Sequence, residues 1–207
     1  MKPFETIRSV AACLPEANVD TDTIFPARFL LLLDRDGLGR YAFHDRRFDR
    51  DRKPVPEFVL NRPPFDTARI LIAGDGFGCG SSREQAVWAL AGFGIGCVIA
   101  PGFGEIFHAN CLKNGVLPVR LPQRHVDRLA ERAQTGAVFT VDLGAGSISI
   151  GDDQLASIDL AESQRQALLN GWDETEQIIR ADGPRIDAFE AAQREIQPWL
   201  HEREERS

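Results

Sequence analysis

The sequence predicts an α/β fold built around a largely parallel, buried sheet. Between residues 69 and 121 short apolar runs alternate with helical ones, which is typical of strand–helix–strand units. A glycine-rich loop joins the first of these strands to the first helix. The predicted strands are Ile70–Ala73, Cys97–Ala100 and Val116–Val119, and the helices between them include Gln85–Leu90 and Glu105–Lys113.

Further elements are expected on both sides of this centre. Period-two alternation around Gly144–Gly146 indicates a β-hairpin, and Asn170-Gly171 indicates the end of a helix. The expected elements are a first strand within residues 4–14, a surface helix over 123–134, hairpin strands at 138–143 and 147–150, and helices at 161–169 and from about 186 to 200. We expect a single domain over residues 1–207, with a frayed charged tail at 201–207.

Composition and charge limit the classes of protein to which this chain can belong. Hydrophobic residues make up 43% and charged residues 27% of the chain, which is ordinary for a soluble globular protein. The net charge of −7 argues against a general nucleic-acid surface. No apolar run approaches the length of a membrane helix and no signal-peptide core is evident, so we expect a cytoplasmic protein without a membrane partner.

The cysteines and histidines match no metal-ligand spacing. Cys13, Cys97 and Cys111 are flanked by apolar residues and are expected to be reduced core residues. Cys79 lies in the glycine loop, where we expect a structural role. His108 falls in the second central helix, where a surface or packing role is expected.

The glycine loop predicts an anion site at the mouth of the sheet. Glycines at 74, 76, 78 and 80 permit positive φ and close approach to a ligand. Ser81 and Glu84 fit a capping box, which predicts a helix start near Ser81 whose N–H groups favour an anion. Arg83 adds a bidentate carboxylate or phosphate binder. A helix cap with a close-packed loop explains the same residues equally well.

Several familiar motifs are excluded by register. The dinucleotide fingerprint fits from no starting glycine, no lysine follows as a P-loop requires, and the hydrolase elbow fails at Glu84. Asp20 and Asp22 resemble calcium ligands, but an EF-hand pattern fails at Thr23 and Phe29. Capping of a turn is the alternative for this acidic segment.

Asp75–Glu84 resembles the G-x-G-S-S-R-E loop of the aconitase superfamily's swivelling domain, and in particular of the small subunits of bacterial 3-isopropylmalate dehydratase. Asn18–Asp22 resembles the N-V-D-T-D segment of that family. Further matches, in the family's order, are Phe58–Asn61, Val98–Pro101, Lys113–Asn114, Leu117–Val119 and Leu169–Asp173. The resemblance covers most of the chain and implies a three-layer (β/β/α) fold with a largely parallel central sheet, an added hairpin and C-terminal helices.

The resemblance also implies an activity and a partner. Family members isomerise 2-isopropylmalate and 3-isopropylmalate through isopropylmaleate, by dehydration and rehydration, in leucine biosynthesis. A [4Fe–4S] cluster carried by a separate large subunit serves as the Lewis acid, and this chain has no evident cluster ligands of its own. The chain is therefore expected to bind a small dicarboxylate and to work as a hetero-oligomer.

Five site residues follow from the matched motifs. Ser81 aligns with the serine that acts as general base, and Arg83 is expected to clamp a substrate carboxylate. Ser82 is either an alternative cap or a substrate contact. Asp20 and Asp22 are expected to orient the site beside the substrate.

Departures from the family pattern leave the substrate open. Gln85 stands where many relatives have histidine, Ala27 follows Pro26 where lysine is common, and Gly76 replaces a frequent asparagine. A homoaconitase-like or other alkylmalate dehydratase subunit is the alternative with the same chemistry. A non-catalytic anion-binding or assembly module is the alternative of a different class.

Two surface segments carry weaker expectations. Phe29–Leu33 reads as a helical core segment, with core packing expected for some of its leucines, and in the family the loop that follows contacts the variable side chain of the substrate, where an apolar loop would suit an isopropyl group. The alternating charges of His44–Lys53 indicate a solvated loop, with contact to a partner chain as the alternative.

Overall fold

The computed structural model describes residues 1–32 and 34–200, which form two compact units. The first unit is Met1–Gly171, and the second begins at Trp172. Leu33 and the predicted charged tail lie outside the described residues. The expectation of one domain over residues 1–207 stays a prediction.

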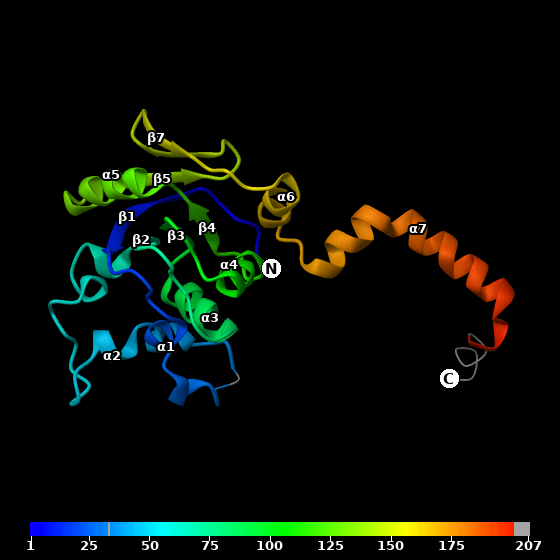
Figure 1. Cartoon of the computed structure of the whole chain (residues 1–207), viewed down its shortest axis with the longest axis horizontal. Helices are drawn as coiled ribbons and strands as arrows, with labels where there is room; N and C mark the ends of the chain where they lie inside the picture. Colours follow the sequence, from blue (N-terminus) through cyan, green and yellow to red (C-terminus); the bar gives the residue numbers. More distant parts are fainter. Residues whose placement is uncertain (33, 201–207) are drawn as a thin grey trace. The chain divides into compact units, whose positions relative to one another are not determined.

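The first unit is organised by a mixed sheet with the strand order β4-β3-β2-β1-β5-β6-β7 (Figure 1). Strands β1 to β4 run parallel, and β5, β6 and β7 continue the sheet in antiparallel fashion. β7 was not predicted, because its residues are polar or only half-buried and carry little apolar alternation. The strands are β1 Ile7–Leu14, β2 Ile70–Ala73, β3 Cys97–Ala100, β4 Leu117–Arg120, β5 Val138–Asp142, β6 Ser147–Ile150 and β7 Asp153–Ser157.

The helices of this unit connect and cover the strands. α4 and α5 begin and end where the sequence predicts, and α6 ends at Gly171 in the left-handed conformation, as the Asn-Gly signature indicates. The helices are α1 Thr21–Ile24, α2 His44–Arg47, α3 Glu84–Phe93, α4 Glu105–Lys113, α5 Gln123–Gln134 and α6 Glu162–Asn170. Short 3-10 turns lie at Ala27–Phe29, Leu38–Tyr41, Val59–Asn61 and Phe65–Thr67.

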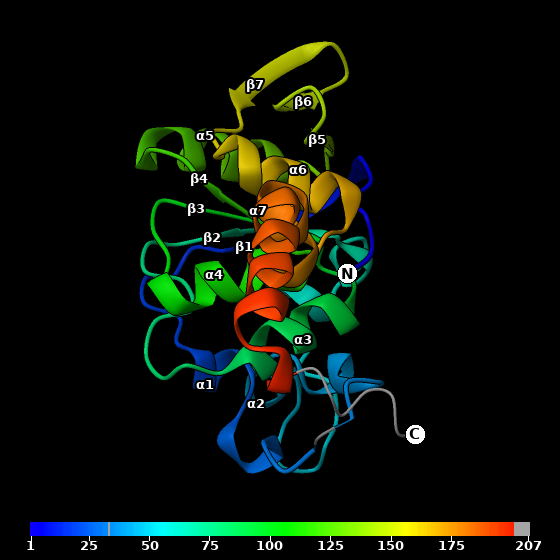
Figure 2. The ribbon, with the colours of Figure 1, turned by 90° about the vertical axis from the view of Figure 1, so that its right-hand side faces the viewer.

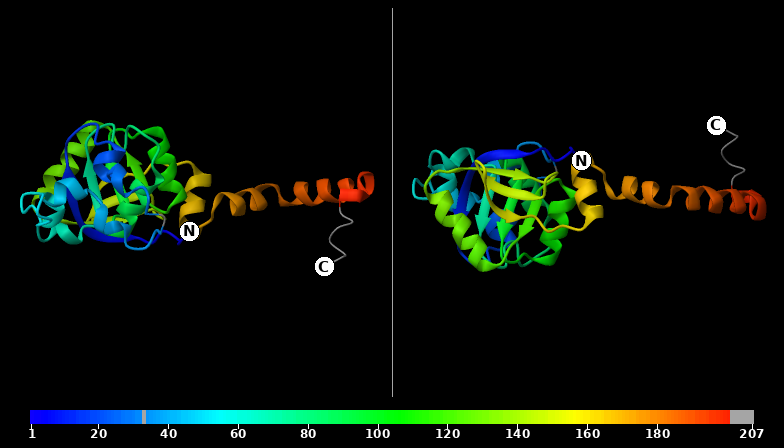
Figure 3. Two further views of the ribbon diagram at one scale, coloured as in Figure 1. Left: turned by 90° about the horizontal axis from the view of Figure 1, so that it is seen from below. Right: turned by 90° about the horizontal axis from the view of Figure 1, so that it is seen from above.

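Two apolar cores lie on opposite faces of the parallel strands. Leu71 and Ala73 of β2 belong to the cluster that includes residues of α3 and α4, whereas Ile70 and Ile72 belong to the cluster that includes residues of α5, β5 and β6. Figure 2 shows α3 and α4 on one side of these strands and α5 with the antiparallel strands on the other, and the right-hand view of Figure 3 looks onto the side of the antiparallel strands. This arrangement is the predicted three-layer fold, and burial on both faces explains the uninterrupted apolar runs.

Helix α3 begins at Glu84, with Arg83 as its N-cap, and no side chain caps it. The predicted capping box at Ser81 and Glu84 is therefore wrong. The Glu84 carboxylate accepts a hydrogen bond from Asn114 Nδ2 at 2.8 Å, and the Ser81 carbonyl accepts one from the Thr21 hydroxyl at 2.8 Å. Both groups are engaged in tertiary contacts, and the N-cap of α3 lies at Arg83, two residues after the predicted cap at Ser81.

The second unit consists of α7, Glu174–Ile196, followed by a 3-10 turn at Pro198–Leu200. The prediction of a helix from about residue 186 missed its first twelve residues. Asp173 and Glu176 form a capping box, with Asp173 Oδ1 accepting from Glu176 N at 2.8 Å. Pro184 lies inside the helix, and no residue of α7 is buried.

The two weaker surface expectations have different outcomes. The predicted helical core segment at Phe29–Leu33 is wrong for its exposed part: Leu31 is 90% exposed, while Leu30 and Leu32 are half-buried against the core. His44–Lys53 forms α2 and then a loop whose residues 49–53 are exposed, as a solvated loop should be.

Candidate functional site

Three loops that follow parallel strands meet at one edge of the sheet (Figure 2). Because the carboxyl ends of adjacent parallel strands share an edge, the segments after β1, β2 and β3 are brought together. Parallel bridges join Asp20 to Cys79 and Phe77 to Phe103. The acidic segment and the glycine loop, which the sequence presents as separate motifs, are therefore neighbours.

Glycine is required where the glycine loop packs on the start of α4. Gly78 has φ +74°, and a Cβ there would lie 2.2 Å from the Phe107 ring. A Cβ on Gly104 would lie 2.4 Å from the Gly78 carbonyl oxygen. The loop can approach α4 only because these side chains are absent, so the loop is close-packed, and the predicted close approach to a ligand stays a prediction.

This close approach leaves a hollow of about 240 Å³ between the glycine loop and the first turn of α4. Ser81 and Arg83 line it, together with Thr21, Glu105 and Ile106. Ser81 is exposed, and its hydroxyl makes no hydrogen bond within residues 1–32 and 34–200. Because Arg83 occupies the N-cap of α3, the interpretation of Ser81 as a mere cap no longer applies.

Arg83 is held at the hollow by the acidic segment. Its Nη1 donates to Asp22 Oδ1 at 2.5 Å and to the Phe25 carbonyl at 3.5 Å, and 15% of its side chain is exposed. Asp22 also accepts from the Ala27 N–H at 2.7 Å. The hydrogen bond from Arg83, and after it that from Ala27, lowers the pKa of Asp22 below its usual value.

The remaining predicted site residues lie beside the hollow. The Asp20 carboxylate caps α1 by accepting from Thr23 N at 2.7 Å. Ser82 is exposed next to Ser81 and does not line the hollow. The structure therefore brings Ser81 and Arg83 together, attaches Asp22 to Arg83, and uses the Asp20 carboxylate locally.

Five residues of the hollow were missed by the sequence analysis: Thr21, Gly104, Glu105, Ile106 and Phe107. Glu105 and Ile106 follow the glycine-containing loop after β3, and the rule that parallel strands share an edge gave a signal for their position. Thr21 is buried, with 2% exposure. Nothing in the local sequence indicates that a threonine between two aspartates should be buried.

The other chemically active side chains have packing roles. Cys97 and Cys111 are buried as predicted, whereas Cys13 is only half-buried, and burial raises the pKa of Cys13 to about 11. The His108 ring packs edge-on against Phe103 at 5.7 Å, and burial, with a smaller effect of a nearby arginine, lowers the pKa of His108. The described ranges contain no group of three or more His, Cys, Asp or Glu that could hold a metal ion.

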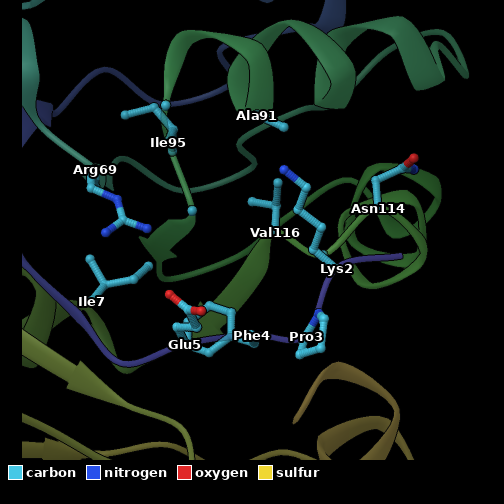
Figure 4. A pocket seen from close by; sticks show the side chains of 13 residues that line it. Lys2, Pro3, Phe4, Glu5, Ile7, Arg69, Ala91, Ile95, Asn114 and Val116 are labelled. Carbon is cyan, nitrogen blue, oxygen red and sulfur yellow. The ribbon is translucent and has the colours of Figure 1, made fainter. Parts of the chain in front are cut away.

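A larger hollow, of about 670 Å³, lies at the opposite, amino ends of the parallel strands (Figure 4). Lys2, Arg69, Ile95, Asn114 and Val116 are among its lining residues. It includes no predicted site residue, so the candidate site is the smaller hollow.

In the part of the chain that the structure describes, no helix is long and apolar enough to span a bilayer.

The family described as the aconitase C-terminal domain matches residues 1–124, a range that includes the loop with Ser81 and Arg83. Relatives named "3-isopropylmalate dehydratase small subunit" are similar over nearly the whole chain. The protein of Paramagnetospirillum magneticum is 46% identical over 97% of this chain and 100% of its own length, and that of Rhodospirillum centenum is 49% identical over 96% and 98%. The chain belongs to this family of small subunits.

A solved structure shows the same fold. The 3-isopropylmalate dehydratase LeuD of Methanocaldococcus jannaschii matches with a TM-score of 0.62 and 24% identity, covering 89% of this chain and 99% of that one. The likeness supports the swivelling-domain architecture predicted from the sequence.

Proposed function

We propose that this chain is the small subunit of a 3-isopropylmalate dehydratase. The enzyme would interconvert 2-isopropylmalate and 3-isopropylmalate through isopropylmaleate, as a hydro-lyase of leucine biosynthesis. The observation that carries the proposal is the hollow in which Ser81, whose hydroxyl has no hydrogen-bond partner among the described residues, lies beside Arg83. Membership of the family of small subunits supports the choice of substrate.

Arg83 binds a carboxylate of the substrate. A guanidinium has five N–H donors, and the carboxylate of Asp22 accepts from a single terminal nitrogen. Nη1 also donates to the Phe25 carbonyl, and among the described residues Nε and Nη2 remain to form the paired hydrogen bonds that a carboxylate accepts. Asp22 thus orients the guanidinium, and Asp20 and Ser82 stay predicted as neighbouring contributors.

Ser81 removes the proton α to a carboxylate and returns a proton during rehydration. A hydroxyl at its ordinary pKa is a weak base, so its ionised form must be favoured by surrounding positive charge. The Arg83 guanidinium and the N-terminal N–H groups of α4, whose first turn lines the hollow, both supply it. Ser81 is therefore activated by its position.

Departure of hydroxide also needs a Lewis acid, which in the family a [4Fe–4S] cluster supplies. The hollow is lined by one carboxylate, that of Glu105, and by no thiolate or imidazole. These residues do not fit a cluster's ligand set. We therefore assign the cluster to a large subunit that completes the site, with this chain supplying the base and the carboxylate clamp.

The proposal is tested in the assembled enzyme. The chain is co-expressed with the large subunit of the same source and purified without oxygen, and isomerisation of 2-isopropylmalate is assayed. Turnover should require both chains and should be abolished in Ser81→Ala. Ser163→Ala, which changes an exposed serine of α6, is the matched control and should retain turnover.

Other outcomes would point to the alternatives. Near-normal turnover of Ser81→Ala would remove Ser81 from the mechanism. A stable complex that turns over another alkylmalate or a homoaconitate instead would establish the related hydro-lyase. Absence of turnover with every substrate would favour a non-catalytic module. A cytoplasmic location stays a prediction.

A further inference from the structure

Among the described residues, Thr21 is the one polar or charged residue that is fully buried, with 2% exposure. A buried hydroxyl without a partner is costly, so its hydrogen bond fixes its surroundings. Thr21 Oγ1 donates to the carbonyl oxygen of Ser81 at 2.8 Å, across 60 residues of sequence. The buried threonine therefore contacts the residue assigned as the general base.

This contact is the last rung of a short ladder between two loops. Asn18 N donates to the Asp75 carbonyl at 2.7 Å, Gly78 N to the Val19 carbonyl at 2.7 Å, and Thr21 N to the Cys79 carbonyl at 3.0 Å. Backbone groups form these rungs, so side-chain changes leave them intact. The rung at Ser81 depends on a side chain.

On the C-terminal side of this hydrogen bond, few contacts fix the backbone before α3 begins. Gly80, at φ +88°, Ser81 and Ser82 are all exposed, and α3 begins only at Glu84. Glycine at positive φ is conformationally permissive, so the loop does not by itself fix the direction of the next peptide. Within residues 1–32 and 34–200, the Thr21 hydroxyl is the hydrogen-bond donor that reaches the Ser81 peptide.

We propose that Thr21 is a positioning residue for the reaction. By holding the Ser81 carbonyl, it sets the direction of the Cα–Cβ bond and keeps the Ser81 hydroxyl in the hollow. The inference rests on the proposed role of Ser81. Arg83 is anchored separately, through Asp22 and the Phe25 carbonyl, so carboxylate binding does not depend on Thr21.

The assignment predicts that loss of the Thr21 hydroxyl slows catalysis more than it weakens binding. A displacement of about 1 Å at a reacting group can cost on the order of 100-fold in rate. We expect Thr21→Val, which keeps the shape but not the donor, to lower kcat by about 10- to 100-fold, with KM changed by less than about threefold. Thr21→Ser, which keeps the hydroxyl, should restore most of kcat.

The test uses the complex with the large subunit, and kcat and KM are measured for each variant. Thr23→Val is the matched control: Thr23 lies in the same short helix, and its hydroxyl makes no hydrogen bond within the described ranges. It should leave kcat unchanged. Amide hydrogen exchange over residues 79–83 should be faster in Thr21→Val than in Thr23→Val.

The kcat values of the variants decide whether Thr21 positions Ser81. Wild-type kcat in Thr21→Val would overturn the inference, as would equal losses in Thr21→Val and Thr21→Ser, which would show that packing matters and the hydroxyl does not. If Thr21→Val does not assemble, Thr21→Ala is assayed in the same way. An inactive wild-type complex would instead refute the proposed function, so the two failures are distinguishable.

Discussion

Arg83 Nη1 lies 2.5 Å from Asp22 Oδ1 and so connects two segments that are 61 residues apart. Asp22 belongs to α1, and Arg83 is the residue immediately before α3. The pair places a guanidinium at the rim of the Ser81 hollow and neutralises part of its charge. Binding of a substrate carboxylate by the other guanidinium donors would therefore add to an existing carboxylate contact.

Asp22→Asn tests whether this pair orients the arginine. The amide keeps the size of the side chain but loses the charge. Asp22 is 55% exposed, and exposed pairs contribute at most about 1 kcal/mol, so we expect KM for isopropylmalate to rise by about two- to fivefold. Asp152→Asn changes an exposed carboxylate and should leave KM unchanged. Equal KM values in all three proteins would contradict the role.

Arg83→Lys tests whether the planar guanidinium, with its paired N–H donors, is needed to bind a carboxylate. Lysine keeps the charge but loses the paired donors, and a charge-assisted hydrogen bond contributes roughly 1.5–3 kcal/mol, so KM should rise by at least about tenfold. The matched control is Arg124→Lys, at an exposed position of α5, for which we expect wild-type kinetics. Unchanged KM and kcat in Arg83→Lys would rule out the carboxylate clamp.

The lowered pKa of Asp22 predicts a pH dependence with a definite sign. A carboxyl whose pKa is lower in the folded chain contributes stability that is present above its unfolded value, near 3.8, and is lost as pH falls through the folded value. The free energy of unfolding of wild type should therefore exceed that of Asp22→Asn at pH 7, and the two should converge as the pH falls below 3.8. Urea unfolding at several pH values measures this difference, and a gap that does not vary with pH would contradict it.

Gly104→Ala tests the close approach of the glycine loop to α4. The added Cβ would lie 2.4 Å from a backbone oxygen, so the loop or helix must shift. Such overpacking typically lowers the free energy of unfolding by about 1–3 kcal/mol. Because the shift would also displace Ser81, the assembled enzyme should lose activity. Gly183→Ala is the control, because a Cβ there meets nothing within 4 Å outside the neighbouring turns of its own helix. Wild-type stability of Gly104→Ala would show that the contact is not tight.

The four thiols are expected to differ in reactivity towards an alkylating reagent at pH 8. Thiolate is the reactive form, and burial raises the pKa of Cys13 to about 11, leaving on the order of 0.1% thiolate. Cys97 and Cys111 are fully buried, and burial raises their pKa values as well. We expect rapid labelling of Cys79 alone in the native chain and of all four after unfolding. Rapid labelling of Cys97 in the native chain would contradict the packing described.

The sequence-based predictions are accurate where local interactions decide the structure and less accurate where long-range contacts decide it. β2, β3, α4 and α5 have the predicted bounds because continuous apolar runs and helical periodicity are local signals. The start of α3 was wrong because the Glu84 carboxylate bonds to Asn114, a residue 30 positions away. The start of α7 was missed although the capping box at Asp173 and Glu176 is visible in the sequence.

In the candidate site, too, the features that depend on local sequence were predicted and those that depend on long-range contacts were not. Ser81 and Arg83 follow from a motif of ten consecutive residues, so the sequence alone identified the family and predicted two residues that line the hollow. Only the tertiary structure places Asp22 on Arg83 and buries Thr21 beneath the Ser81 carbonyl. Those contacts arise because parallel β1 and β2 bring their carboxyl ends to one edge, and a pairing between strands some 60 residues apart leaves no trace in either local pattern.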